Sequence, residues 1–170
     1  GFYLALTLVL LGLIVRGVGF EFRSKDPRPG WRSLWDWAIC AGSLIPALIF
    51  GVAVGNLLRG VPIDASKTYV GGFFNLLNPF ALVCGIAFVL LFLLHGAYFL
   101  NLRVSGPLQP RVASAAKGLW IPAVLAAVAL VAYAWKATGL LAGGAVAWAV
   151  VGAAAVALVL SGVVAGSKPG

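Results

Sequence analysis

The chain has 170 residues, of which 62% are hydrophobic and 9% are charged, and its formal net charge is +8. Soluble domains carry about 25% charged and about 45–50% apolar residues, so this composition excludes an ordinary soluble fold and intrinsic disorder. The basic residues stand mostly in short polar gaps between apolar runs, which is typical of membrane loops and not of nucleic-acid binding. We therefore expect an all-α, polytopic transmembrane helical bundle with lipid around it.

Five apolar runs divide the chain, and a bilayer core of about 30 Å needs about 20 such residues in a helix. The runs do not alternate as barrel strands do, and lipid offers no partner for open backbone, so helices are favoured over strands. The sequence contains no Met and opens inside an apolar run, so we expect a fragment of a longer protein. We predict a single transmembrane domain over 1–170, with helices near 1–16, 35–58, 79–102, 118–135 and 141–165.

The basic residues predict the orientation of these helices. They are concentrated in alternate loops, with Arg16, Arg23, Lys25, Arg28 and Arg32 in one and Arg103, Arg111 and Lys117 in another. The loop between these two carries only Arg59 and Lys67. Cytoplasmic loops hold the excess of Lys and Arg, so we expect the 16–34 and 103–117 loops in the cytoplasm and the 59–78 loop outside.

Few residues could carry chemistry. Asp36 stands at the entry of the second helix between Trp35 and Trp37, and Arg32 precedes it by four positions, the spacing of a helical pair. Its carboxylate is either a proton-relay group or half of an interfacial ion pair. The position at the helix entry favours the ion pair. Arg16 at the end of the first helix suits the negative end of the helix dipole, and Glu21 has pair spacing to Lys25.

His95 is the sole histidine, about 24 Å along the third predicted helix. A lone intramembrane histidine could ligate a haem iron or pass a proton, but the chain offers no second His and no Met as axial partner. We expect an interhelical hydrogen bond instead. Cys40 and Cys84 are predicted at opposite depths, too far apart for a disulfide, and are expected to be packing residues.

Polar and small residues elsewhere predict structural roles. Asn56, Asn75 and Asn78 have the character of cap and turn residues around the 59–78 loop. The pairs Gly51/Gly55, Gly139/Gly143 and Gly162/Gly166 have the spacing that lets helix backbones approach closely. We expect no catalytic, cofactor-binding or metal-binding residue in this chain.

Several strings in the first 103 residues resemble one known family. They are VRGVGFEFRSK at 15–25, WRSLWDW at 31–37, GNLLRGVP at 55–62, FFNLLNPF at 73–80 and the HGA at 95–97. In these strings the chain is similar to subunit II of the cytochrome bd ubiquinol oxidases. The resemblance implies a fragment that lacks the first helices and the C-terminal part of that subunit.

The resemblance also implies a role. The family couples quinol oxidation to the reduction of oxygen to water in bacterial or archaeal respiratory chains, in the cytoplasmic membrane. The haems b and d and the quinol loop are expected in subunit I, the partner, with a small accessory subunit as a further candidate partner. This chain would then be a structural partner that lines proton or oxygen access. The alternatives are a structural subunit of another membrane complex and a secondary transporter.

The residues singled out are therefore expected to have structural or interface roles. They are Arg16, Glu21, Arg23, Arg32, Trp35, Asp36, Asn56 and His95.

Overall fold

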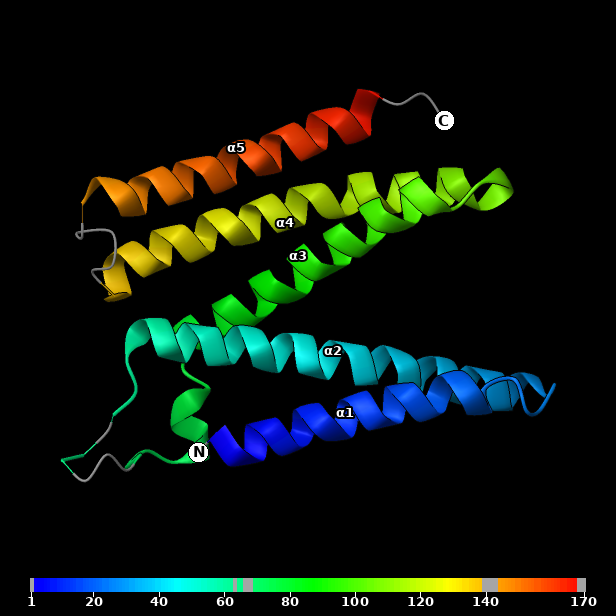
Figure 1. The fold of residues 1–170 in the computed structure, drawn as a ribbon, viewed down its shortest axis with the longest axis horizontal. Coiled ribbons are helices and arrows are strands. Elements are labelled where there is room, and N and C mark those ends of the chain that lie inside the picture. The colour runs from blue at the N-terminus through cyan, green and yellow to red at the C-terminus, as the bar shows by residue number, and fades with distance from the viewer. Residues whose placement is uncertain (1, 63, 66–68, 139–143, 168–170) are drawn as a thin grey trace. The chain divides into compact units, whose positions relative to one another are not determined.

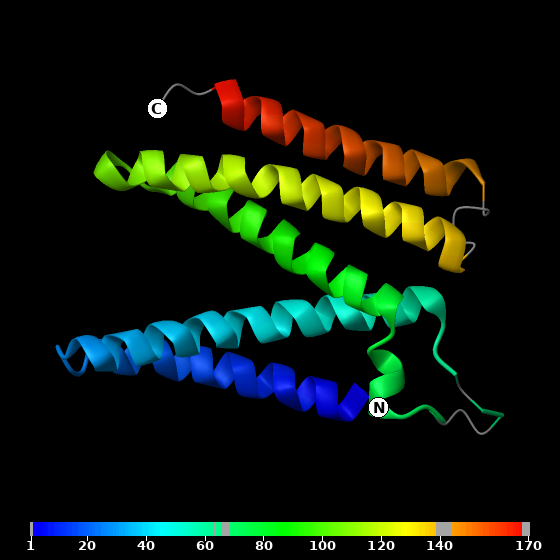
Figure 2. The same cartoon turned by 180° about the vertical axis from the view of Figure 1, so that it is seen from behind.

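The chain folds into long helices, as a computed structural model describes it over residues 2–62, 64–65, 69–138 and 144–167 (Figures 1 and 2). The α-helices are α1 (Phe2–Phe22), α2 (Pro29–Arg59), α3 (Pro79–Arg103), α4 (Gln109–Thr138) and α5 (Ala145–Ser167). Two short 3-10 helices, η1 (Phe73–Leu76) and η2 (Gly106–Leu108), precede α3 and α4. The chain divides within α3 into two compact units, residues 1–85 and 86–170.

The helices have the character of membrane spans. Four helical stretches in the described part of the chain are long and apolar enough to cross a bilayer: Tyr3–Phe22, Pro29–Arg59, Pro79–Arg103 and Gly106–Ala137. The apolar stretch within α5, Ala147–Gly162, is shorter. Large apolar side chains such as Leu10, Leu125 and Val150 are more than half exposed, as expected for side chains that face lipid. The predicted all-α membrane bundle is thus confirmed.

Several helices extend beyond the apolar runs that predicted them. α1 continues through Arg16 to Phe22, α2 begins at Pro29, and α4 begins at Gln109. Hydropathy marks the part of a helix that matches the hydrocarbon core, whereas backbone hydrogen bonding continues into the polar interface. Pro29 also suits the first turn of α2, where a missing N–H leaves no bond unmade.

Close backbone contact holds α1 and α2 side by side in the first unit (Figures 1 and 2). A Cβ atom added at Gly42 would lie 2.6 Å from the carbonyl oxygen of Gly12 and 3.1 Å from the Cβ of Arg16. A Cβ added at Gly12 would lie 3.1 Å from the ring of Pro46, which is buried inside α2. The missing side chains therefore allow the two backbones to approach, which is how helices associate in membranes.

A second close contact joins α2 to the start of α3. A Cβ atom at Gly55 would lie 2.8 Å from the Cα of Ala81 and 2.9 Å from the Sγ of Cys84. Gly51 and Gly55 are both buried, so this predicted small-residue pair lies at a real contact. Cys84 is a buried free thiol and packs as predicted, while the free thiol of Cys40 is exposed.

The second unit contains a contact between α4 and α5. The indole Nε1 of Trp120 donates a hydrogen bond of 3.0 Å to the carbonyl oxygen of Leu158. The same indole contacts Gly162, one member of the predicted Gly162/Gly166 pair. Trp135 and Trp148 meet edge to face with ring centroids 5.7 Å apart. The Gly139/Gly143 pair lies outside the described residues.

The contact at Gly42 predicts that alanine substitution destabilises the protein at Gly42 but not at Gly17. Gly42→Ala places a methyl group against backbone that cannot yield, so it should cost about 1–3 kcal/mol, the usual cost of overpacking. Gly17→Ala is the matched control, because nothing lies within 4 Å of a Cβ there and alanine favours the helix. The melting temperature of the purified protein should fall for Gly42→Ala and hold or rise for Gly17→Ala. Equal melting temperatures would mean that α1 and α2 do not depend on this contact.

Candidate functional site

The turn between α1 and α2 carries a charged cluster, and its strongest pair is Arg23 with Asp36. Arg23 Nε donates to Asp36 Oδ1 at 2.5 Å, and Nη2 donates to Oδ2 at 3.2 Å. Both side chains are about half exposed, at 47% and 52%. The planar guanidinium thus binds both carboxylate oxygens, which is the favoured geometry for this pair. The hydrogen bond and charge of Asp36 raise the pKa of Arg23 above its ordinary value.

The ion-pair partner of Asp36 differs from the one that helical spacing predicts. Arg32 was expected to pair with Asp36, but the ion pair is made by Arg23. The reason is that α1 does not end at Arg16. It continues to Phe22, so the chain delivers Arg23 to the end of the hairpin, opposite the first turns of α2. Asp36 therefore joins two helices, whereas a pair with Arg32 would have stayed within one.

Two further ion pairs lie in the same turn. Lys25 Nζ is 3.2 Å from Glu21 Oε1, as their spacing predicts. Arg28 Nη2 is 2.6 Å from Asp26 Oδ2, and the Arg28 backbone N–H donates to Asp26 Oδ1. These hydrogen bonds from Arg28 lower the pKa of Asp26 below its ordinary value. The turn is thus a set of paired charges, and its acids are all matched within it.

Aromatic side chains pack beside these charges. Trp31 Nε1 donates a hydrogen bond of 2.8 Å to the carbonyl oxygen of Phe22, which has no partner inside α1 because the helix ends there. Trp35 contacts both residues, with centroids 5.7 Å from Trp31 and 5.6 Å from Phe22. The Nε1 atom of Trp35 is buried without a hydrogen-bond partner in the described residues. Arg16 lies over the ring of Phe20, 5.7 Å from its centroid.

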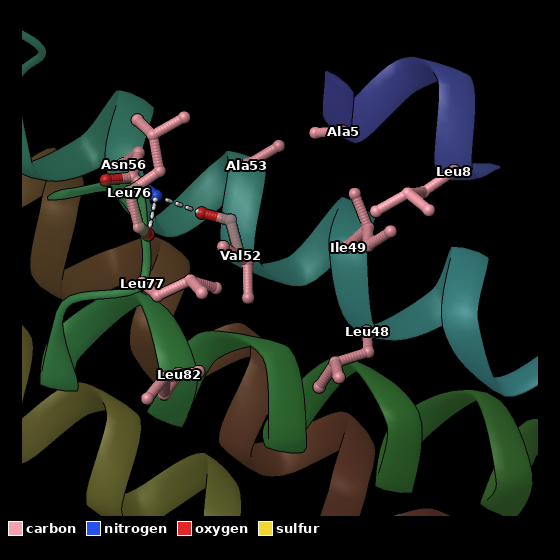
Figure 3. A pocket seen from close by; sticks show the side chains of 10 residues that line it. All are labelled: Ala5, Leu8, Leu48, Ile49, Val52, Ala53, Asn56, Leu76, Leu77 and Leu82. Atoms are coloured by element: carbon pink, nitrogen blue, oxygen red, sulfur yellow. Dashed lines mark hydrogen bonds between the residues drawn. The ribbon is translucent and has the colours of Figure 1, made fainter. Parts of the chain in front are cut away.

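A neutral polar network occupies the opposite end of α2. Asn56 is only 4% exposed, and its Nδ2 donates to the carbonyl oxygens of Val52 at 2.8 Å and Leu76 at 2.7 Å (Figure 3). Asn78 Nδ2 donates to Asn56 Oδ1 at 2.8 Å, and Asn78 Oδ1 accepts from the Ala81 N–H at 3.0 Å. Asn78 therefore caps α3, as predicted, and ties it to α2.

The interhelical hydrogen bond expected of His95 stays a prediction. Its side chain is exposed on α3, and no hydrogen bond from it to another helix occurs among the described residues of its own unit, 86–167. No group of three or more His, Cys, Asp or Glu side chains that could hold a metal ion occurs among the described residues. Of the predicted site residues, those at the charged turn are Glu21, Arg23, Arg32, Trp35 and Asp36. Asn56 belongs to the network at the other end of α2. Arg16 lies within α1, over Phe20, and His95 lies within α3.

Sequence reasoning missed two features of these sites. The pairing of Arg23 with Asp36 spans 13 positions across a turn, and only the longer α1 could have indicated it. The donation from Asn56 to Leu76 spans 20 positions and closes the connection between α2 and α3. Both are contacts between different elements, and the periodicity of residues along one element gives no information about such contacts.

Comparisons with known proteins identify the family. The family model of the cytochrome bd terminal oxidase subunit II matches residues 1–168. A probable cytochrome oxidase subunit 2 of Haemophilus influenzae is 50% identical over 115 residues, 65% of this chain and 30% of that protein. The cytochrome bd-I ubiquinol oxidase subunit 2 of Escherichia coli K12 is 44% identical over 138 residues, 79% of this chain and 35% of that protein. The cytochrome bd ubiquinol oxidase subunit 2 of Bacillus subtilis is 40% identical over 136 residues, 78% of this chain and 40% of that protein.

The chain spans about a third of the length of these relatives. The strings that first indicated the family lie in its first unit, except for the HGA at 95–97, which lies in the second. The family model covers both units, from the α1–α2 hairpin to the end of α5. An all-α bundle of membrane-spanning helices agrees with that match. The chain belongs to the family of the cytochrome bd terminal oxidase subunit II.

Proposed function

We propose that this chain is part of the second subunit of a membrane-bound oxidase that oxidises a quinol and reduces oxygen to water. The observation that carries the proposal is the family match over residues 1–168, together with relatives named as ubiquinol oxidase subunits. Its role there is to support a catalytic partner. The charged turn supports this role, because its acids are matched by bases and none stands free for chemistry.

The haems that the family implies do not fit the described residues of this chain. The only histidine, His95, is exposed on α3, and the sequence contains no Met that could serve as a second axial ligand. The described residues also bring together no cluster of ligating side chains. We therefore assign the haems b and d, and the oxidation of quinol, to a partner subunit, with a small accessory subunit as a further candidate partner.

Purification of the complete oxidase through a tag on this subunit tests the proposal. A haem-bearing partner should elute with it, and the preparation should consume oxygen when ubiquinol is added. His95→Gln and His95→Leu should then keep the full haem content per complex. Hydrogen bonds of such side chains in membranes contribute only about 0.6–2 kcal/mol, so His95→Leu should at most reduce the yield. A preparation without haem would contradict the function, and the loss of one haem band in an intact complex would make His95 a ligand.

We further propose that the complex lies in the bacterial or archaeal cytoplasmic membrane, with the 16–34 and 103–117 loops facing the cytoplasm. The support is the density of basic residues at the α1–α2 turn, where Arg23, Lys25, Arg28 and Arg32 lie close together. Positively charged loops remain on the cytoplasmic side during membrane insertion. The connection from α2 to α3 then faces outward.

Cysteine labelling in intact cells tests this sidedness. In a background with Cys40→Ala, a Ser24→Cys variant should resist an impermeant thiol reagent, and an Ala65→Cys variant should react. Both positions are exposed in the structure, so access to the reagent depends on the side of the membrane alone. Permeabilised cells, in which both variants should react, provide the control. Labelling of Ser24→Cys but not of Ala65→Cys in intact cells would invert the orientation.

The pairing of Arg23 with Asp36 predicts an effect on assembly and not on turnover. Asp36→Asn removes the charge and keeps the shape, so less complex should assemble while oxygen consumption per haem stays unchanged. The exchange Arg23→Asp with Asp36→Arg should restore assembly, because it keeps the bidentate pair. Lys25→Gln, which breaks the neighbouring pair with Glu21 within one turn, is the matched control and should assemble normally. Full assembly of Asp36→Asn with turnover lost would instead indicate a role for its carboxylate in proton transfer.

A further inference from the structure

Two hollows meet at the wall formed by Asn56 and Leu76, and they differ in chemistry. One is an apolar groove of about 90 Å³ between α1, α2 and the start of α3, with Leu8, Leu48, Val52 and Leu82 among its walls (Figure 3). The other is a larger cavity of about 380 Å³ at the end of α2, lined by Arg59, Tyr69, Asn75 and Asn78. Asn56 and Leu76 line both. The apolar groove thus adjoins a polar cavity that carries the positive charge of Arg59.

Some of the hydrogen-bond donors that line the polar cavity are already engaged, and others are free to hold a ligand. Asn56 and Asn78 have committed their amide groups to each other and to backbone, as described above. Arg59 is exposed and forms no ion pair or hydrogen bond among the described residues. Asn75 is exposed as well, and only its backbone is engaged in the described contacts. The cavity therefore presents a guanidinium with its five donors, and one amide, to an anion.

We propose that an anionic phospholipid binds here, with its phosphate on Arg59 and one acyl chain in the apolar groove. A guanidinium binds phosphate oxygens in pairs and is favoured where a phosphate is recognised at a membrane boundary. Arg59 stands at the end of a membrane-spanning helix, which is the depth of lipid headgroups. A free phosphate would leave the groove unfilled, and a neutral amphiphile would leave Arg59 unpaired. This inference concerns a lipid site and does not depend on the oxidase activity.

Lipid retention by the complete, delipidated membrane complex tests the proposal. The complex is incubated with phosphatidylglycerol or phosphatidylcholine of identical acyl chains, and bound lipid is measured by native mass spectrometry. The wild type should retain the anionic lipid in preference to the zwitterionic one. Arg59→Gln should retain roughly tenfold less phosphatidylglycerol, the usual effect of losing a hydrogen bond to a charged group. Arg103→Gln, at the corresponding end of α3, is the matched control and should retain it normally.

Two further variants separate the contributions of the headgroup and the acyl chain. Leu82→Trp places a large ring in the groove and should lower retention of the lipid while leaving Arg59 intact. Arg59→Lys keeps the charge, and should keep the preference for phosphatidylglycerol over phosphatidylcholine if Arg59→Gln fails to assemble. Soluble glycerol 3-phosphate should not displace the lipid, since it has no chain for the groove.

The outcomes that overturn the proposal are distinct. Equal retention of both lipids by the wild type would leave no role for charge. Equal retention of phosphatidylglycerol by the wild type and by Arg59→Gln would remove Arg59 from the site. Displacement by glycerol 3-phosphate would make it a site for free phosphate esters. Retention of no lipid, or of a neutral quinone alone, would assign the hollows to a protein neighbour or to a different amphiphile.

Discussion

Lipid is as apolar as a leucine side chain, so two helices in a membrane gain little free energy by burying apolar surface against each other. What remains is close van der Waals contact, and the α1–α2 hairpin achieves it where Gly12 meets Pro46 and Gly42 meets the Gly12 carbonyl. This contact sets where α2 lies. α2 in turn places Gly55 against Ala81 and Asn56 beside Leu76, so the start of α3 depends on it as well.

Polar groups gather at the two ends of α2, because an unpaired polar group inside a bilayer is costly. At one end, Arg23 and Asp36 fasten α1 to α2 with a charged pair that remains half exposed. At the other end, Asn56 and Asn78 fasten α2 to α3 with neutral amides, and Asn56 is almost wholly buried. The charged pair thus lies where solvent can screen it, and the buried contact uses groups that carry no net charge.

The two hollows follow from the same arrangement. The side-chain amides of Asn56 and Asn78, which join α2 to α3, hydrogen-bond to each other. Both line the polar cavity, and Arg59 is the cation that lines it with them. The apolar groove lies where the hairpin meets the start of α3, and the small side chains of Ala5 and Ala53 are among those that line it. A cation next to an apolar groove at the end of a span matches the two chemical halves of an anionic lipid.

The sequence by itself determined the class of the protein, because composition and run length report directly on the solvent that surrounds a chain. It also predicted that Asn78 caps α3 and that Gly55 lies at a close contact, since caps and small residues act locally. It misplaced the ion-pair partner of Asp36. The tertiary structure decided that partner, because it depends on which groups a neighbouring helix presents at that level. Periodicity along one helix carries no information about that register, which follows from where Gly42 and Gly55 let the backbones meet.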